Sequence, residues 1–270
     1  MATSTALRLT GRDTLPLLHR VTSNALDDLE PGEARATLWC DFRGRLQYRA
    51  VVAVAADGAV WLLRADAPGA ELAAAVDKMI FRDDVRVEDV SDAYHFELAR
   101  GATGDAGILD QANGVPSVVS TGDGTRLVRA GTAESLAESA RIMLLHPRHG
   151  HEIADAFNPF EVGLAHEVHL AKGCFTGQEA LQRLITYESV RRRPARVQIG
   201  GSAPSLPSDV LAKGDSPGDR AGVLTSFDAG EGFAILRREP LEAGADFALA
   251  DGRVVEVIAA PEPARPLGRP

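Results

Sequence analysis

The chain has 270 residues, 45% of them hydrophobic and 25% charged, which is ordinary for a globular protein that buries a large core. Its net charge of −9 argues against a general nucleic-acid binder, because such proteins carry a basic face. No apolar run approaches the ~20 residues that span a bilayer, and residues 1–10 lack a secretory pattern. We therefore expect a cytoplasmic protein that contacts neither membranes nor nucleic acid directly.

The N-terminal part of the chain alternates short strands with single helices. Asp13 stands at the expected N-cap of the first helix, and Leu72, Val76, Met79 and Ile80 share the inward face of the second. The pattern predicts an α+β architecture and not a regular βαβ winding. The predicted strands cover 6–9, 34–41, 46–55, 59–63, 85–90, 94–99, 115–119 and 126–129, and the predicted helices cover 13–23, 68–80 and 132–142.

A different pattern begins after Arg193-Pro194. Short strands separated by glycine turns predict a small antiparallel barrel or sandwich, without a convincing helix. The chain would then divide into 1–194, a barrel over 195–260, and a disordered tail over 261–270. The predicted barrel strands cover 196–199, 221–226, 233–237, 247–250 and 254–259.

Two cysteines, Cys40 and Cys174, are too few for a disulfide framework or for an iron–sulfur site built from four thiolates. Cys40 follows Trp39 in an apolar strand and is predicted to be packed. His166 and His169 have a spacing that could share a helix face and hold a metal, but no acid–histidine pattern completes such a site. We therefore predict no metal site.

Cys174 lies between two glycines in the stretch Lys172-Gly173-Cys174-Phe175-Thr176-Gly177-Gln178-Glu179. Gly173 and Gly177 permit a tight, open backbone, and a helix is predicted over 179–187. The thiol would lie on a loop ahead of a helix start, where the helix field and Lys172 would favour the thiolate. From the residues alone, a small buried cysteine is an equally open alternative.

This stretch, with Arg183 four residues later, resembles the signature of the YgfZ family, Lys-Gly-Cys-aromatic-x-Gly-Gln-Glu-x-x-x-Arg, without a gap. A weaker resemblance runs from Leu7 to about Ala260. The family comprises tetrahydrofolate-binding relatives of the glycine-cleavage aminomethyltransferase, implicated in making or repairing iron–sulfur clusters and in tRNA modification. The resemblance implies an N-terminal region of two interleaved α/β units and a C-terminal β-barrel, packed around a central cavity that holds folate.

The resemblance also implies a site around the thiol. Cys174 would be a reactive or transient ligand thiol near the folate, with Lys172 favouring the thiolate. Arg183 could pair with Glu179 on one helix face, and hydrogen bonds from Gln178 and Glu179 would fix the loop. The remaining members of the motif loop are Gly173, Phe175 and Gly177.

Two further segments would contact folate. Phe157-Asn158-Pro159-Phe160-Glu161-Val162-Gly163-Leu164 resembles a Pro-x-Glu-x-Gly-Leu segment of the relatives, whose glutamate hydrogen-bonds the pterin ring. Glu161 is therefore a candidate pterin contact, and a glutamate at a helix start after Pro159 is the alternative. The run Arg191-Arg192-Arg193 resembles a basic segment that supplies a folate-contacting arginine, with a solvated linker as its alternative.

Tyr48 occupies the hairpin position where the aminomethyltransferase relatives carry a catalytic aspartate. A phenol cannot replace that carboxylate, and the nearby Asp41 comes before the turn. The resemblance therefore favours a tetrahydrofolate-binding accessory protein for iron–sulfur cluster assembly or repair, with transient contacts to iron–sulfur proteins or assembly factors. A folate-dependent one-carbon transferase and a non-catalytic folate-binding scaffold are the alternatives, so enzyme activity stays open.

Overall fold

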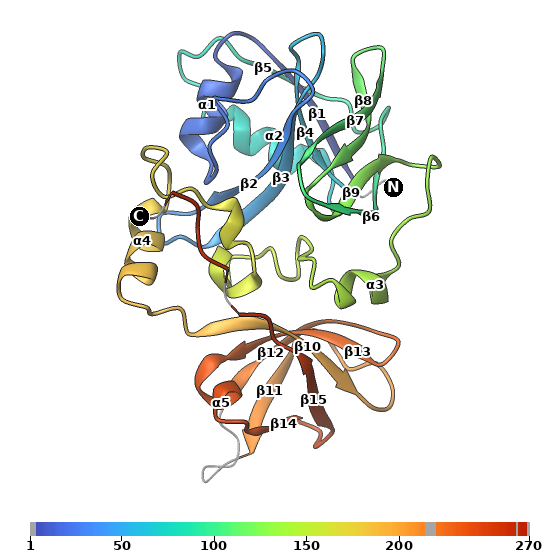
Figure 1. Ribbon diagram of the computed structural model, residues 1–270, viewed down its shortest axis with the longest axis vertical. Helices are drawn as coiled ribbons and strands as arrows, with labels where there is room; N and C mark the ends of the chain where they lie inside the picture. Colours follow the sequence, from blue (N-terminus) through green and yellow to red (C-terminus); the bar gives the residue numbers. More distant parts are fainter. Residues whose placement is uncertain (1–3, 214–219, 263, 269–270) are drawn as a thin grey trace.

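The computed structural model describes residues 4–213, 220–262 and 264–268, and it forms two antiparallel sheets followed by a closed barrel (Figure 1). The sheets lie in the upper part of the view, the barrel in the lower part, and the yellow-green linking segment between them. This arrangement confirms the predicted α+β class with a C-terminal antiparallel barrel. Among the described residues, no helix is long and apolar enough to cross a membrane.

The first sheet has the strand order β2-β3-β4-β1-β5 and packs against two helices. Leu7, Leu9 and Leu62 form part of the core on this face, and Leu18 and Leu72 reach them from the helices. The elements are β1 (Thr5–Thr10), α1 (Thr14–Val21), β2 (Ala34–Cys40), β3 (Leu46–Val54), β4 (Val60–Arg64), α2 (Gly69–Asp77) and β5 (Arg86–Asp89).

The second sheet has the order β6-β9-β8-β7. Its strands all come after the first sheet in the chain, so the two units are consecutive and not interleaved as the resemblance implied. Strand β7 was not predicted, because its residues are mostly half-buried or exposed and carry no apolar alternation. The elements are β6 (Phe96–Thr103), β7 (Gly107–Ala112), β8 (Val115–Ser120) and β9 (Asp123–Arg129).

The barrel closes in the order β10-β13-β12-β11-β14-β15 around Val197, Leu224, Leu236 and Phe247. Strand β11 and helix α5 were not predicted from the sequence. The elements are β10 (Arg192–Ile199), β11 (Ser208–Lys213), β12 (Arg220–Asp228), β13 (Glu231–Arg237), α5 (Arg238–Glu242), β14 (Asp246–Leu249) and β15 (Val254–Ala259).

The segment that links the sheets to the barrel contains α3 (Glu138–Met143), the 3-10 helices η1 (Pro159–Val162) and η2 (Ala165–Glu167), and α4 (Gln178–Thr186). It contributes Phe157 and Leu181 to a core that also contains Leu46 of the first sheet and Phe233 of the barrel. Cys40 is packed in the same core, and burial raises the pKa of its thiol to about 12, so this cysteine is inert.

Three helix predictions need correction. Helix α3 is shorter than predicted, because Leu136 N donates to Leu98 O (2.6 Å) and so joins the edge of β6. Met79 lies beyond the end of α2 and is 42% exposed, so it is not an inward residue. Asp13 stands at the N-cap of α1 but makes no capping bond, because its carboxylate accepts from Asp84 N (2.8 Å).

The predicted disorder of the tail is wrong for residues 264–268. Leu267 N donates to Val168 O (2.8 Å) and Leu267 O accepts from Leu170 N (2.9 Å), which forms a parallel bridge to His169. Pro266 is buried. The tail therefore returns from the barrel and is held by backbone bonds to the segment that leads into the Cys174 loop. Pro263 and residues 269–270 lie outside the described residues.

We predict that deleting residues 264–270 exposes the segment that leads into the Cys174 loop. The lost backbone hydrogen bonds contribute about 1 kcal/mol each, so trypsin should cleave after Lys172 faster than in the intact chain. Limited proteolysis followed by mass spectrometry measures this. Glu262→Gln is the control, because it removes only the Arg193–Glu262 ion pair (3.1 Å). Equal cleavage after Lys172 in the truncated and intact chains would contradict the prediction.

Candidate functional site

Cys174 is exposed on a loop that ends at the start of α4. Gly177 is the N-cap of that helix with φ 84°, and a Cβ at this position would lie 2.4 Å from Asp41 O. Only glycine fits this close approach to the turn between β2 and β3. Gly173, with φ 113°, also has a conformation that favours glycine. The two glycines therefore account for the shape of the loop.

The other signature residues hold this loop or the helix after it. Gln178 Nε2 donates to Leu170 O (2.8 Å), which closes the loop across its base. Phe175 is buried in the core that the linking segment shares with the first sheet and the barrel. Among the described residues, Glu179 has no hydrogen bond to the loop; it forms an exposed ion pair with Arg183 on one face of α4. Of the two residues expected to fix the loop, Gln178 is therefore the one that bonds it.

The Lys172 ammonium contacts α1 and the Phe175 ring, and it was predicted to lie beside the Cys174 thiol. Its Nζ donates to the carbonyl oxygen of His19 and lies 5.0 Å from the centre of the Phe175 ring. His19 Nε2 in turn lies 2.9 Å from Lys172 O. Burial lowers the pKa of Lys172 to about 8. Lys172 thus ties the loop to α1, and the described residues show no bond between it and Cys174.

Glu161 and Arg192, predicted as separate folate contacts, bind each other. Arg192 Nε donates to Glu161 Oε1 (2.8 Å), and Arg192 Nη2 donates to Glu161 Oε2 (3.0 Å). Glu161 Oε2 also accepts from Asn158 N (3.1 Å) in a capping box, and Arg45 lies 3.4 Å away. Both carboxylate oxygens therefore already have protein donors, although Oε1 accepts only the Arg192 Nε bond.

The three consecutive arginines point to different places. Arg191 is exposed, Arg192 binds Glu161, and Arg193 is buried and pairs with Glu262 in the tail. Arg192 and Arg193 face opposite sides of β10, because successive residues of a strand alternate between the two faces of a sheet.

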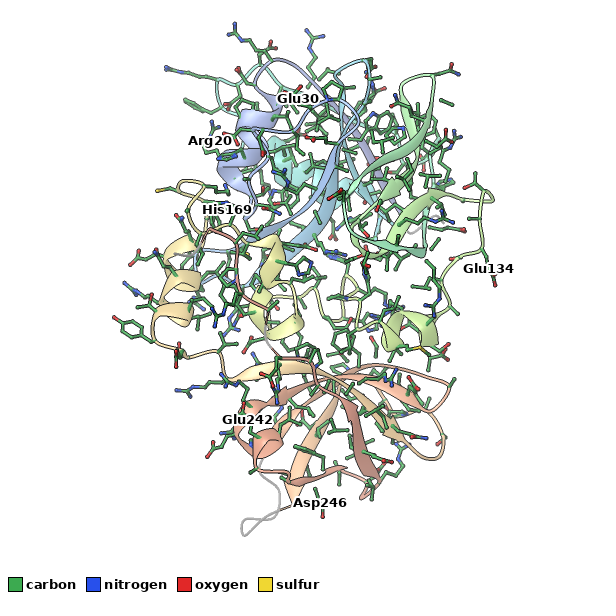
Figure 2. The ribbon with its side chains drawn as sticks, in the orientation of Figure 1. Arg20, Glu30, Glu134, His169, Glu242 and Asp246 are labelled. Atoms are coloured by element: carbon green, nitrogen blue, oxygen red, sulfur yellow. The ribbon has the colours of Figure 1, made fainter. Side chains whose placement is uncertain are left out.

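A cavity of about 730 Å³ lies elsewhere, lined by β3 and β4 of the first sheet, β6 and β9 of the second, α3, and residues 146–151. None of the residues predicted for the site lines it. Figure 2 shows His169, which precedes the Cys174 loop, on the left flank, and Glu134, which precedes α3, on the right flank. Cys174 does not line this cavity, and its expected placement beside a folate pocket stays a prediction.

Arg49, at the back of the cavity, joins three parts of the chain. Its guanidinium binds Glu167 of η2 (2.6 Å) and Asp123 of β9 (3.2 Å), and its Nη1 donates to His146 Nε2 (3.0 Å). Burial opposes the charge of Arg49, but Glu167 outweighs it and holds its pKa above the usual range. Burial likewise opposes the charge of Asp123, but His146 and Arg49 keep its pKa well below the usual range.

Glu152, which is fully buried, joins the cavity to the barrel. Its Oε2 accepts from Arg141 Nη1 (3.2 Å) of α3, and its Oε1 accepts from Ser226 Oγ (2.8 Å) and from Thr225 Oγ1 of β12. Arg141 also binds Glu138 (2.8 Å). This network fixes the floor of the cavity against the barrel.

Several polar atoms in the cavity wall are buried without a hydrogen-bond partner among the described residues. They are Arg64 Nη1, His95 Nδ1, Arg148 Nε and His149 Nδ1. Buried polar atoms in folded proteins are rarely left unpaired. The four residues that carry these atoms all line the cavity, which makes it the candidate ligand site.

Tyr48 borders this cavity without lining it. Its ring stacks on His149, with ring centres 6.0 Å apart, and the Arg64 guanidinium lies 5.7 Å from its centre. The sequence reasoning missed Arg64, Asp66 and His149. Their signals were polar residues directly after an apolar strand, in Val60-Trp61-Leu62-Leu63-Arg64-Ala65-Asp66, and the histidine-rich stretch 146–151.

We predict that Arg49→Met lowers the free energy of unfolding by about 3–5 kcal/mol, because it leaves Glu167 and Asp123 buried without their cation. Urea unfolding measures the loss. Arg183→Met is the control, since its pair with Glu179 is exposed and contributes about 0–1 kcal/mol. Similar losses in the two variants would contradict the prediction.

Acid should destabilise the protein through Asp123. Its folded pKa lies below that of an unfolded aspartate, so its contribution is complete above about pH 4 and is lost as the pH falls further. Asp123→Asn should therefore make the unfolding free energy less dependent on pH below about pH 4. An unchanged slope in this variant would show that Asp123 does not carry the effect.

Comparisons with known proteins bear on the fold. No family model matches the chain. Over 134 residues it is 34% identical to a chloroplastic protein of Arabidopsis thaliana that its name classes provisionally as a transferase. That alignment covers 44% of this chain and 30% of the relative, so the chain spans less than a third of the length of that relative. The glycine cleavage system aminomethyltransferase T from Bartonella henselae superposes with a TM-score of 0.70 at 15% identity, over 94% of this chain and 82% of that chain. The chain therefore has the aminomethyltransferase fold.

Proposed function

We propose that this chain binds a tetrahydrofolate in the 730 Å³ cavity and acts as an accessory protein for iron–sulfur cluster assembly or repair in the cytoplasm. This is the role of the YgfZ family, and residues 172–179 resemble the signature of that family. The observation that carries the proposal is the cavity itself, with its four buried polar atoms that have no protein partner. The aminomethyltransferase fold supports the choice of ligand, since the relatives of this fold are folate enzymes.

The cavity fits the chemistry of a folate. Its volume lies within the range of about 300–1,000 Å³ that is usual for pockets that bind organic ligands. The apolar residues Leu63, Phe96 and Leu127 are part of its lining. Arg64 and Arg148 supply donors for carboxylates, which a folate carries at its glutamate end.

This proposal assigns Glu161 and Arg192 a structural role. Their mutual ion pair and the capping box with Asn158 satisfy Glu161 without a ligand. Tetrahydrofolate would instead be held by the residues that line the cavity, where it would supply one-carbon chemistry or a structural ligand.

Cys174 would act on the surface, apart from the folate. It is exposed, its loop is braced by the Gln178–Leu170 bond, and the neighbouring Gly173 has open space beside it. An accessible thiol on a braced loop can reach a partner protein that carries or receives an iron–sulfur cluster. The bound folate would then stabilise the body on which the loop is mounted.

A one-carbon transferase is the second candidate, and Asp66 favours it. Asp66 lines the cavity, and one of its oxygens, Oδ2, accepts from His149 N (2.7 Å). The other oxygen has no hydrogen bond within the described residues, so it could orient a folate nitrogen. Formation of a one-carbon folate by the pure protein, lost in Asp66→Asn, would establish this function in place of the accessory role.

We predict that Ala130→Trp weakens tetrahydrofolate binding at least tenfold, because this exposed alanine lines the cavity and a large ring there would obstruct it. Calorimetric titration of the intact chain measures the affinity. Ala243→Trp, an exposed alanine after α5 on the barrel, is the matched control and should bind like the wild type. Absence of tetrahydrofolate binding by the wild type would refute the cavity assignment.

In cells that lack the native protein, Cys174→Ala should fail to support iron–sulfur enzymes, although the pure variant should bind tetrahydrofolate normally. The exposed neighbour Thr176→Ala is the control and should support them fully. The accessory role of the thiol is wrong if Cys174→Ala restores enzyme activity completely. In that case the scaffold alternative stands, and Cys174 should alkylate no faster than a free thiol at neutral pH.

A further inference from the structure

Arg64 is held rigidly at the end of β4. It pairs with Thr5 in the neighbouring strand β1, and its Nε donates to Thr5 Oγ1 (2.8 Å). Its Nη2 donates to Pro68 O (2.7 Å), and Thr5 Oγ1 is itself fixed by a bond to Ala67 O (2.7 Å). These contacts orient the guanidinium and leave Nη1 without a partner.

The charge of Arg64 has no counterion, although the residue is only 4% exposed. Arg141 and Arg193 are also buried, and each binds a carboxylate. Arg64 forms no ion pair with any described residue; Asp66 and Glu71 act on it only from a distance. A buried cation that is bound only by a hydroxyl and a carbonyl is costly. Such a cost is offset when an anion binds.

Arg64 and His149 both line the cavity. Each also lies against the Tyr48 ring: the Arg64 guanidinium is 5.7 Å from the ring centre, and the His149 ring stacks on it at 6.0 Å. His149 Nδ1 is a second buried atom without a partner, and the His149 backbone is fixed by Asp66. Two lining residues next to the same aromatic ring therefore each carry one buried polar atom without a partner among the described residues, although His149 Nε2 lies 4.0 Å from Glu71.

We infer that Arg64 and His149 form an oxyanion subsite that binds a carboxylate of the cavity ligand. Arg64 Nη1 donates to the carboxylate, and His149 donates from Nδ1. Identification of this carboxylate with the glutamate end of tetrahydrofolate rests on the proposed function. The subsite lies in the N-terminal half of the chain, apart from the arginine run 191–193.

The test compares three probes on the intact chain: tetrahydrofolate, 4-aminobenzoylglutamate, and 6,7-dimethyltetrahydropterin, which has no carboxylate. Loss of a hydrogen bond to a charged group corresponds to about 10- to 100-fold in affinity. Arg64→Met should weaken the two carboxylate ligands by this factor and leave the tetrahydropterin within about twofold. Arg64→Lys should fall between the two, because it keeps the charge but loses the fixed geometry.

Arg220→Met is the matched control, since it removes an exposed arginine of β12 that pairs with Asp209 (2.8 Å) on the barrel, and it should bind all three probes normally. If Arg64→Met binds tetrahydrofolate as tightly as the wild type, the subsite is wrong while the proposed function stands. If the wild type binds no tetrahydrofolate, the proposed function fails and the subsite is tested by 4-aminobenzoylglutamate and inorganic phosphate. These anions should raise the thermal midpoint of the wild type and not that of Arg64→Met; an equal shift, or none in either, overturns the inference.

If Arg64 served only to clamp Thr5 and Pro68, its replacement would lower the thermal midpoint of the free protein and weaken all three probes alike. The carboxylate-specific loss is therefore the readout that separates binding from structure.

Discussion

The buried guanidinium of Arg49 holds the body of this protein together. It lies in a strand of the first sheet and binds a carboxylate of η2, a carboxylate of the second sheet and His146. Because arginine can only donate, His146 Nε2 must accept, and the proton of its ring sits on Nδ1, which faces Asp123. One side chain thus fixes the relative position of both sheets and the linking segment, and the cavity exists because these parts are held apart at fixed distances.

A second buried network, around Glu152, connects α3 and the cavity wall to the barrel. Glu152 receives donors from α3 and from β12, so the cavity floor and the barrel wall share one carboxylate. The tail adds a third tie, from the end of the barrel to the segment before the Cys174 loop. These ties join the cavity wall, the barrel and the segment before the Cys174 loop, although Cys174 itself does not line the cavity. In our proposal, folate binding and thiol chemistry are therefore separate tasks of one scaffold.

The sequence predicted the fold where periodicity was strong. The apolar runs of β2, β3 and β4 and the hairpin signal Asp57-Gly58 are local features, and local features survive in the structure. Strands β7 and β11 were not predicted, because each mixes polar with apolar residues and is defined by its pairing with neighbouring strands. The tail failed for the same reason: the partner of Leu267 is about a hundred residues away, and composition alone reads as disorder.

The site was predicted only in part. The exposed loop of Cys174 followed from its two glycines, whereas the partners of Lys172, Glu161 and Arg192 are tertiary choices that no spacing reveals. The cavity residues Arg49, Arg64 and Asp66 looked like strand ends, and only the fold gathers them. Burial without partners, the property that marks Arg64 and His149, is invisible until the structure is known.

The most direct test is a crystal structure of the protein grown with tetrahydrofolate. The account predicts ligand density in the cavity between β3, β4 and α3, with a carboxylate within hydrogen-bond distance of Arg64 and with the Arg192–Glu161 pair intact. Density against Glu161 with Arg192 displaced, or beside Cys174 with the cavity unchanged, would contradict it.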